Sequence, residues 1–192
     1  KGYRGYPNSL CTSLNEVIVH GIPSDRALKD GDILSLDFGV IYKGFCGDAA
    51  VTIPIGETSE RAENLMRTTK ECLEKAIGLM YEGNRLADVS AVIQEHAEKN
   101  GYSVVRDFVG HGIGRSLHED PQVPNYGKSG TGIRLKRGMV LAVEPMVHGG
   151  DWGIRILKDG WTAVTKDGSL SAHFEHSVAI TDNGPSILSK LQ

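Results

Sequence analysis

Hydrophobic residues change their spacing twice along the chain, which divides it into three stretches. Residues 17–19 and 33–40 are β-branched and apolar and lie between turn residues, so we predict strands there and at 49–55. From Ala62 to Met80, apolar residues recur at three- and four-residue steps, which is typical of an amphipathic helix. Ser59 can cap this helix, and Gly83 is expected to end it.

A second helix is predicted at 86–100, and strand-like patterns then return to the end of the chain. These strands are expected at 103–109, 139–147, 154–157, 161–165 and 174–181. Lys158-Asp159-Gly160 predicts a hairpin turn, because Asp-Gly tolerates the positive φ of such turns. Strands, two helices and strands again indicate an α+β fold with a largely antiparallel sheet. No linker or repeat divides the sequence, so residues 1–192 are expected to form a single domain.

Composition argues against several classes of binding partner and structural site. The chain has 192 residues, with 21 Lys and Arg against 24 Asp and Glu, so it lacks the clustered positive charge that nucleic acids or anionic membranes require. No apolar run approaches the roughly 18 residues of a membrane span. Three widely spaced cysteines without a CxxC pair argue against a disulfide framework or a structural zinc site. A reducing compartment, the cytoplasm, fits best.

Carboxylates inside apolar stretches are the first sign of chemistry. Asp37 and Glu144 lie within predicted buried strands, and Asp48 and Glu175 are in strand-like stretches too. A buried carboxylate is costly unless it is paired, hydrogen-bonded or bound to a metal. A neighbouring Arg or solvent usually explains one such residue, but four in a small chain favour a cation. Asp37 and Asp48, 48−37 = 11 residues apart across a Gly-containing bend, can face each other in a hairpin.

Two histidines add a nitrogen donor to these acids. His111 and His118 bracket a loop whose glycines, Gly112 and Gly114, allow close approach of the backbone to a ligand. A lone His is more often a structural hydrogen-bonding group than a ligand. Together with the acids, His111 is better interpreted as a metal ligand.

Several stretches, in order through nearly the whole chain, resemble the type I methionine aminopeptidases of the pita-bread metallopeptidase family. They are residues 13–23 (SLNEVIVHGIP), Asp37-Phe38-Gly39, Gly47-Asp48, residues 110–115 (GHGIGR), Glu144-Pro145-Met146 and Glu175-His176. The resemblance implies a pita-bread fold, in which a pseudo-two-fold antiparallel sheet is covered by helices. It also implies removal of the N-terminal methionine from nascent chains and peptides, near the ribosome, by a metal-bridged hydroxide.

The resemblance implies two divalent metal ions per chain. By similarity Asp37 binds one ion, Asp48 and Glu175 bridge both, and His111 and Glu144 complete the other site. Oxygen ligands with one imidazole suit Mn, Fe, Co or Zn, and the sequence does not choose among them. A monovalent cation is implied near Asn15 and Ser171.

Roles for the remaining site residues also come from the resemblance. Glu144 is similar to the residue that accepts the proton of the attacking water, and His118 to the one that hydrogen-bonds the substrate carbonyl. His20 is similar to the histidine that contacts the scissile amide nitrogen. His176, next to Glu175, is expected to orient a metal ligand without binding the metal itself. The methionine pocket is expected to be lined by Tyr3, Tyr6, Cys11, Leu117, Trp161 and Phe174, with His20 and His118 beside the substrate.

The sequence departs from the family in a few places. Gly39 and Ala49 stand where some relatives have hydroxyl groups, and Arg4 stands where a His is often found. The family's N-terminal helices over the first half of the sheet are expected to be missing. The family is monomeric. If the sheet is uncovered, we expect this protein to self-associate, to bind the N-terminal segment as a separate chain, or to be less active than a full-length relative.

Two other functions stay open. A proline-specific peptidase of the same fold, either an Xaa-Pro aminopeptidase or a prolidase, would share the metal ligands, but Met146 after Glu144-Pro145 favours methionine aminopeptidase. The 144−118 = 26 residues between His118 and Glu144 leave no room for the insert of type II enzymes. A non-enzymatic pita-bread binding protein would be expected to have lost metal ligands, and all five positions are present here.

Overall fold

The computed structural model describes residues 2–190. Its helices are the short 3-10 turn η1 (Tyr3–Gly5), α1 (Glu60–Ile77) and α2 (Leu86–Lys99). The strands before the helices are β1 (Cys11–Leu14), β2 (Val17–Val19), β3 (Ile33–Tyr42) and β4 (Phe45–Pro54). Those after them are β5 (Ser103–Val104), β6 (Gly110–Gly112), β7 (Glu119–Val123), β8 (Val140–Val143), β9 (Met146–His148), β10 (Ile154–Ile156), β11 (Ala163–Thr165), β12 (Ser171–His173), β13 (Glu175–Thr181) and β14 (Gly184–Ile187).

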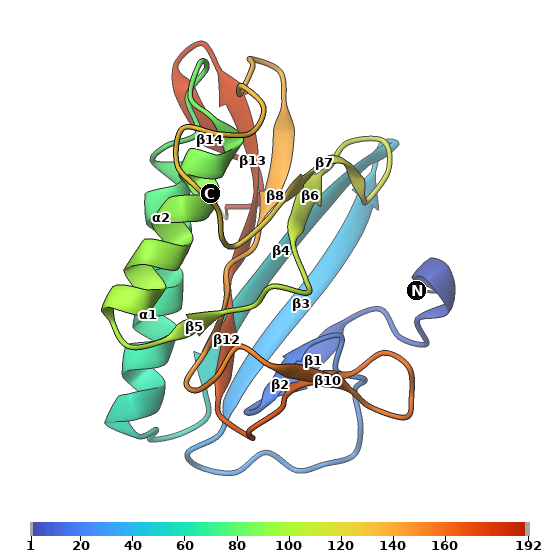
Figure 1. Cartoon of the computed structure of the whole chain (residues 1–192). Coiled ribbons are helices and arrows are strands. Elements are labelled where there is room, and N and C mark those ends of the chain that lie inside the picture. Colours follow the sequence, from blue (N-terminus) through green and yellow to red (C-terminus); the bar gives the residue numbers. More distant parts are fainter. Residues whose placement is uncertain (1, 191–192) are drawn as a thin grey trace.

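A large antiparallel sheet is the scaffold of the molecule. Its strand order is β1-β3-β4-β13-β8-β6-β7, and β14 pairs with β13. Two smaller sheets are β10-β11-β2, which joins segments from both ends of the chain, and β12-β9-β5, whose strands all come from its second half. Helices α1 and α2 lie together on one side of the large sheet, and the N-terminal segment lies on the opposite side (Figure 1). The predicted α+β class with a largely antiparallel sheet is confirmed.

Helix α1 begins where its cap predicts but ends earlier than expected. The Ser59 hydroxyl accepts a hydrogen bond from the Ala62 amide, which satisfies one free N–H of the first turn. The helix ends at Gly78 rather than Gly83. Gly83 instead lies beyond a further turn, with φ +93° and its amide bonded to the Leu135 carbonyl at 3.0 Å. The apolar spacing continues to Met80 because that turn still packs into the core.

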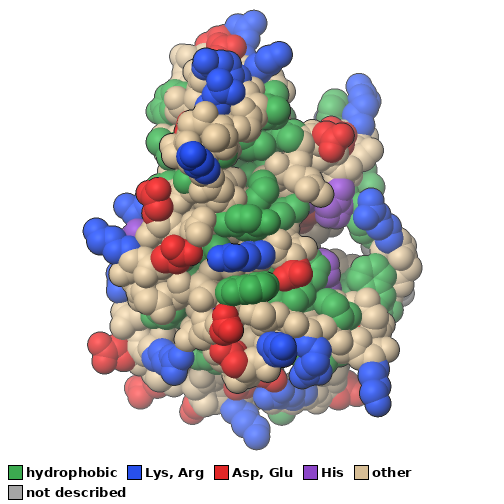
Figure 2. Space-filling model, viewed as in Figure 1, with side chains coloured by type: hydrophobic (Ala, Val, Ile, Leu, Met, Phe, Trp, Pro, Cys, Tyr) green, Lys and Arg blue, Asp and Glu red, His purple; other side chains and the backbone are tan. Residues whose placement is uncertain are grey.

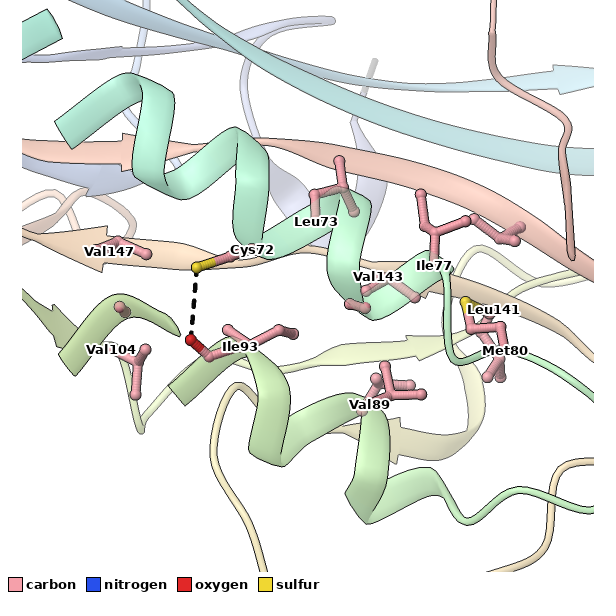
Figure 3. Close-up of a cluster of buried hydrophobic side chains, with 14 of the residues drawn as sticks. Cys72, Leu73, Ile77, Met80, Val89, Ile93, Val104, Leu141, Val143 and Val147 are labelled. Atoms are coloured by element: carbon pink, nitrogen blue, oxygen red, sulfur yellow. Dashed lines mark hydrogen bonds between the residues drawn. The ribbon is translucent and has the colours of Figure 1, made fainter. Parts of the chain in front are cut away.

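The main core lies between the two helices and the sheet. Apolar side chains of α1 and α2, among them Leu65 and Ile93, meet those of β8 and β13 in one buried cluster. In Figure 3 the Cys72 thiol of α1 points at the Ile93 carbonyl of α2, a hydrogen bond of 3.4 Å that ties the helices together. The Met and Leu positions of the predicted amphipathic helix therefore serve packing.

Several predicted strands are shorter or divided. The strand expected at 139–147 is split into β8 and β9 at Glu144-Pro145, since proline has no N–H for a strand ladder. The strand expected at 103–109 is regular only at Ser103–Val104. Strands β1, β6, β7, β12 and β14 were not predicted, because they are at most five residues long and lack clear alternation.

Two hairpins match their turn signals. Strands β3 and β4 pair from Ile33↔Pro54 to Tyr42↔Phe45, with positive φ at Lys43 and Gly44. Strands β10 and β11 pair across the predicted Asp-Gly turn, where Gly160 has φ +76°.

Apolar residues remain exposed on the β3–β4 hairpin. Ile41 and Tyr42 are 78% and 71% exposed near its tip, and Phe45 is exposed beside them. Among the described residues, no helix is both long enough and apolar enough to cross a membrane.

Candidate metal centre and adjoining pocket

The register of the large sheet gathers the four acids on one face. Asp37 of β3 and Glu175 of β13 each pair with Ala50 of β4, so all three side chains point to the same side. Glu144 follows directly after Val143, whose partner His176 is the neighbour of Glu175. The acids from β3, β13 and the end of β8 therefore form one row across the sheet.

A second row lies two residues further along the same strands. Asp48 pairs with Gly39, and its backbone amide donates to the Ser177 hydroxyl at 2.9 Å. Ser177 pairs with Ala142, which in turn pairs with His111. Because strand side chains repeat every second residue, Asp48 and His111 point to the same face as the first row. The predicted facing of Asp37 and Asp48 across a hairpin is confirmed as a diagonal pair.

His111 is oriented for a ligand on that face. Its Nδ1 lies 2.9 Å from the Gly112 carbonyl, which favours a proton on Nδ1 and leaves Nε2 free as a donor to a metal. Nε2 lies 3.5 Å from Glu144 Oε1 and 3.9 Å from Asp48 Oδ2. Burial lowers the pKa of His111, so the ring is neutral near pH 7, as a metal ligand must be.

The carboxylates repel one another in the protein alone. Burial raises the pKa of Asp37 to about 6, and burial with the charge of Asp37 raises that of Asp48 to about 7. Burial and the neighbouring acids raise the pKa of Glu144 and Glu175 well above the usual range. In the described structure no Lys or Arg forms an ion pair with any of the four. A bound cation would balance this negative charge.

The donor set fits a divalent metal. Ligand atoms of Asp48, His111 and Glu175 all lie within 4.8 Å of one another. Glu175 Oε1 is fully buried and has no hydrogen-bond partner among the described residues, which is costly for a carboxylate oxygen without a cation. Carboxylate oxygens with one imidazole suit several divalent metals.

A pocket of about 230 Å³ adjoins these acids, and Figure 2 shows the molecule hollowed here, with histidine side chains in the hollow. Tyr6 closes one side; it is buried, its hydroxyl donates to the Gly21 carbonyl at 2.8 Å, and its ring meets Trp161 edge-on at 5.3 Å. Burial raises the pKa of the Cys11 thiol to about 12, so this wall is neutral.

Two histidines lie at the pocket as predicted. His20 has φ +59°, uncommon for a residue with a side chain, and its ring meets Phe108 edge-on at 5.4 Å. Burial lowers its pKa. The Tyr3 hydroxyl lies 2.7 Å from His118 Nδ1 and orients that ring, and Leu117 lies beside it in the pocket wall.

The remaining predicted residues have different surroundings. Phe174 does not line the pocket and packs against the main core. The Ser171 amide donates to the Asn15 carbonyl at 2.8 Å, so those two residues meet. The Asn15 side chain, however, is engaged by Asp32 and by the Ile33 amide. Thus only backbone oxygen or the buried Ser171 hydroxyl is free to face a cation there. His176 bonds to the Ser189 hydroxyl at 2.8 Å.

One residue at the site was not predicted. His173 is buried, and its Nε2 lies 3.8 Å from Glu144 Oε2 with no hydrogen-bond partner among the described residues. It stands two residues before Glu175 in the sequence, but Phe174 separates β12 from β13 and the two strands belong to different sheets, so strand alternation gives no signal for it.

Comparisons with known proteins agree with this geometry. The model of metallopeptidase family M24 matches residues 1–182. A methionine aminopeptidase of Clostridium perfringens is 55% identical over 192 residues, covering 100% of this chain and 77% of that protein. One from Escherichia coli is 49% identical over 188 residues, covering 97% of this chain and 71% of the relative.

Solved structures give the same result. The crystal structure of a methionine aminopeptidase from Thermotoga maritima superposes with a TM-score of 0.98 at 57% identity, covering 100% of this chain and 77% of that one. A prolidase from Pyrococcus furiosus superposes with a TM-score of 0.77 at 23% identity, which shows a shared fold only. The pita-bread fold expected from the resemblance is confirmed.

Proposed function

Because the chain belongs to metallopeptidase family M24, we propose that it removes the N-terminal methionine from peptides and nascent proteins. The observation that supports this most is a row of acids, without a Lys or Arg partner among the described residues, that borders a largely apolar pocket. High identity to proteins named methionine aminopeptidase along the whole chain supports this assignment over other activities of the fold.

We assign Asp37, Asp48, His111, Glu144 and Glu175 as the ligands of two divalent ions. Four carboxylates carry −4 and two such ions +4, so the loaded site is near neutral before a hydroxide is added. When bound, the metal ions would supply an activated water and polarise the scissile carbonyl. Binding of metal to the folded protein alone should stabilise it by about 4 kcal/mol at a thousand times Kd.

The chain's own side chains would position and transfer the protons. Glu144, at the end of β8, would accept the proton of the attacking water and pass it to the leaving amine. His118, held by Tyr3, would donate a hydrogen bond to the substrate carbonyl oxygen as negative charge develops there. His20, at the inner side of the pocket, would contact the scissile nitrogen.

The pocket would receive the methionine side chain. Tyr6, Cys11 and Trp161 offer apolar, polarisable surface without charge, which suits a thioether. The high pKa of Cys11 keeps its thiol protonated at neutral pH. An acidic or basic first residue would lose hydration there without a partner.

The test is release of the first residue from Met-Ala-Ser by protein stripped with chelator and then restored with Co, Mn, Fe or Zn. We expect release only after restoration, together with a higher melting temperature. An Xaa-Pro peptide tests the proline-specific alternative, and its preferential cleavage would overturn the methionine assignment. If no residue is released with any of these metals, the protein is not an aminopeptidase.

A further inference from the structure

A second groove continues outward from the metal pocket. It has a volume of about 500 Å³, within the range of ligand sites, and shares Tyr3, Arg4, Gly39, Leu117 and His118 with the metal pocket. Its outer wall is made by β3 and β4 together with the loop after β6, through Val40, Ile41, Cys46, Arg115 and Ser116. The two spaces therefore adjoin along a shared wall, and together they outline a path from the metal ligands toward solvent.

The path is closed at one end and open at the other. Tyr6 is buried at the inner end, whereas Tyr3 is 41% and Ile41 78% exposed at the outer end. Gly39 keeps the junction open, because a Cβ there would lie 3.0 Å from a Leu117 methyl group. The groove past Leu117 and His118 gives a peptide whose first residue fills the buried end a route to solvent.

Positive charge is unbalanced along the outer groove. Its described lining contains two arginines, Arg4 and Arg115, and no Asp or Glu. Neither arginine forms an ion pair among the described residues. Glu119 is the acid nearest to Arg115 in the sequence, and its carboxylate accepts a hydrogen bond from the Ser116 amide at 2.7 Å.

An aromatic ring lies under each guanidinium group. Arg4 lies over the ring of Tyr3, which lines the groove, at 5.4 Å. Arg115 lies over the ring of Phe45 at 5.0 Å; Phe45 lines the neighbouring hollow, and Arg115 borders both spaces. The charge of Arg4 also contributes to the low pKa of His118, about 4, after desolvation and His111. Arg4 is thus close to the residue proposed to contact the scissile carbonyl.

Building on the proposed function, we propose that this groove binds the substrate residues that follow the scissile bond and that Arg4 and Arg115 select a carboxylate there. An extended chain advances about 3.3–3.6 Å per residue, so the second to fourth residues of a substrate lie in the groove. The carboxylate is either an acidic side chain of a long chain or the C-terminus of a short peptide. Guanidinium groups bind either one by paired N–H donors.

Matched peptides separate the two sources. In C-terminally amidated Met-Ala-Xaa-Ser-Gly peptides, Asp at Xaa should raise kcat/KM about two- to fivefold over the isosteric Asn, as expected for exposed charge pairs. Met-Ala-Ser as a free acid should exceed its amide by a similar factor. Both ratios should fall toward one as salt rises to about 1 M, where the Debye length is about 3 Å.

Variants assign the effect to the two arginines. The ratio of Asp to Asn peptide should fall to about one in Arg4→Gln/Arg115→Gln and be only partly retained in Arg4→Lys/Arg115→Lys, which keeps the charge but not the paired donors. Each ratio is taken within one variant, so any general loss of folding or metal cancels. Arg155→Gln, an exposed arginine of β10 away from the groove, is the matched control and should keep the wild-type ratio.

The outcomes are distinguishable from failure of the proposed function. Cleavage of the neutral peptides with an Asp to Asn ratio near one in wild type would overturn the groove assignment and leave the peptidase intact. An acid preference that survives in the double Gln variant would also overturn it. Cleavage of no peptide under any metal would instead refute the peptidase.

Discussion

The two faces of the central sheet are made by alternate residues of the same strands, yet they are stabilised in opposite ways. On β13, Val178 and Ile180 join the apolar core under the helices, whereas Glu175 and Ser177 face the metal centre. The helix face is closed by packing within the chain. The site face carries buried acids that the described chain does not neutralise.

This difference shows where the molecule gives up stability for function. Every buried apolar residue on the helix face stabilises the folded state. The acids on the other face oppose folding unless they are protonated or bound to metal. Changes on the two faces should therefore separate stability from activity, which the following variants examine.

The largest expected effect is loss of activity in Glu175→Gln. Loss of a proposed bridging oxygen should lower kcat/KM on Met-Ala-Ser more than about 100-fold. Mutation of residues that only orient the metal ligands already lowers metal affinity or activity about 10–100-fold. The metal-free variant should melt no lower than the metal-free wild type, since a buried carboxylate is removed. Glu74→Gln, an exposed glutamate of α1, is the control for both measurements. Activity near wild type would exclude Glu175 as a ligand.

The helix face should show the reverse in Leu65→Ala. Leu65 is fully buried in the core, so the free energy of unfolding should fall by about 2–5 kcal/mol in denaturant titrations. The kcat of the folded, metal-loaded fraction should stay the same, because Leu65 lies in the core and does not line the pocket. Leu28→Ala, at a 46% exposed leucine, should change stability little. A specific loss of kcat in Leu65→Ala would show that the two faces are coupled.

The acids should also give the metal-free protein an unusual pH dependence. The pKa of Asp37 and of Asp48 is raised in the folded state, so the folded protein holds more protons there than the unfolded chain. Their stabilising effect is complete below about pH 4 and is lost as pH rises to about 7. At about 1.4 kcal/mol per pKa unit, the loss should reach at least about 2 kcal/mol.

The Asp48→Asn variant separates the contribution of Asp48 to this pH dependence from that of the other titrating groups. The difference in unfolding free energy between the metal-free variant and wild type should grow in favour of the variant from about pH 4 to 7. Metal-loaded wild type should lack this decline, because metal replaces the protons. A constant difference across the range would mean that Asp48 is not buried among like charges.

The sequence predicted most of this arrangement because its signals are local. Ser59 marks the start of α1, and the eleven-residue spacing of Asp37 and Asp48 predicts their hairpin. Tertiary packing decided what the sequence did not show. Gly83 seemed to end α1 because Met80 remains in the core, and Phe174 packs against that core rather than lining the pocket.

His173 shows the same limit at the site itself. Strand β12 has only three residues and no clear alternation, so nothing local indicated that the His173 ring is buried. Its approach to Glu144 depends on where β12 lies relative to the end of β8, which is a long-range contact. Only the tertiary structure supplies this information.

The smallest effect, expected in His173→Ala, tests whether His173 belongs with the site face. Its imidazole, 3.8 Å from Glu144 Oε2, is placed to hold that carboxylate in position. We expect kcat to fall about tenfold with little change in KM, within the 10–100-fold range for residues that orient ligands. His173→Gln, which keeps a donor, should recover part of the loss, although both variants remove buried imidazole packing. Equal loss of stability and of kcat in both variants would make His173 a packing residue of the helix face instead.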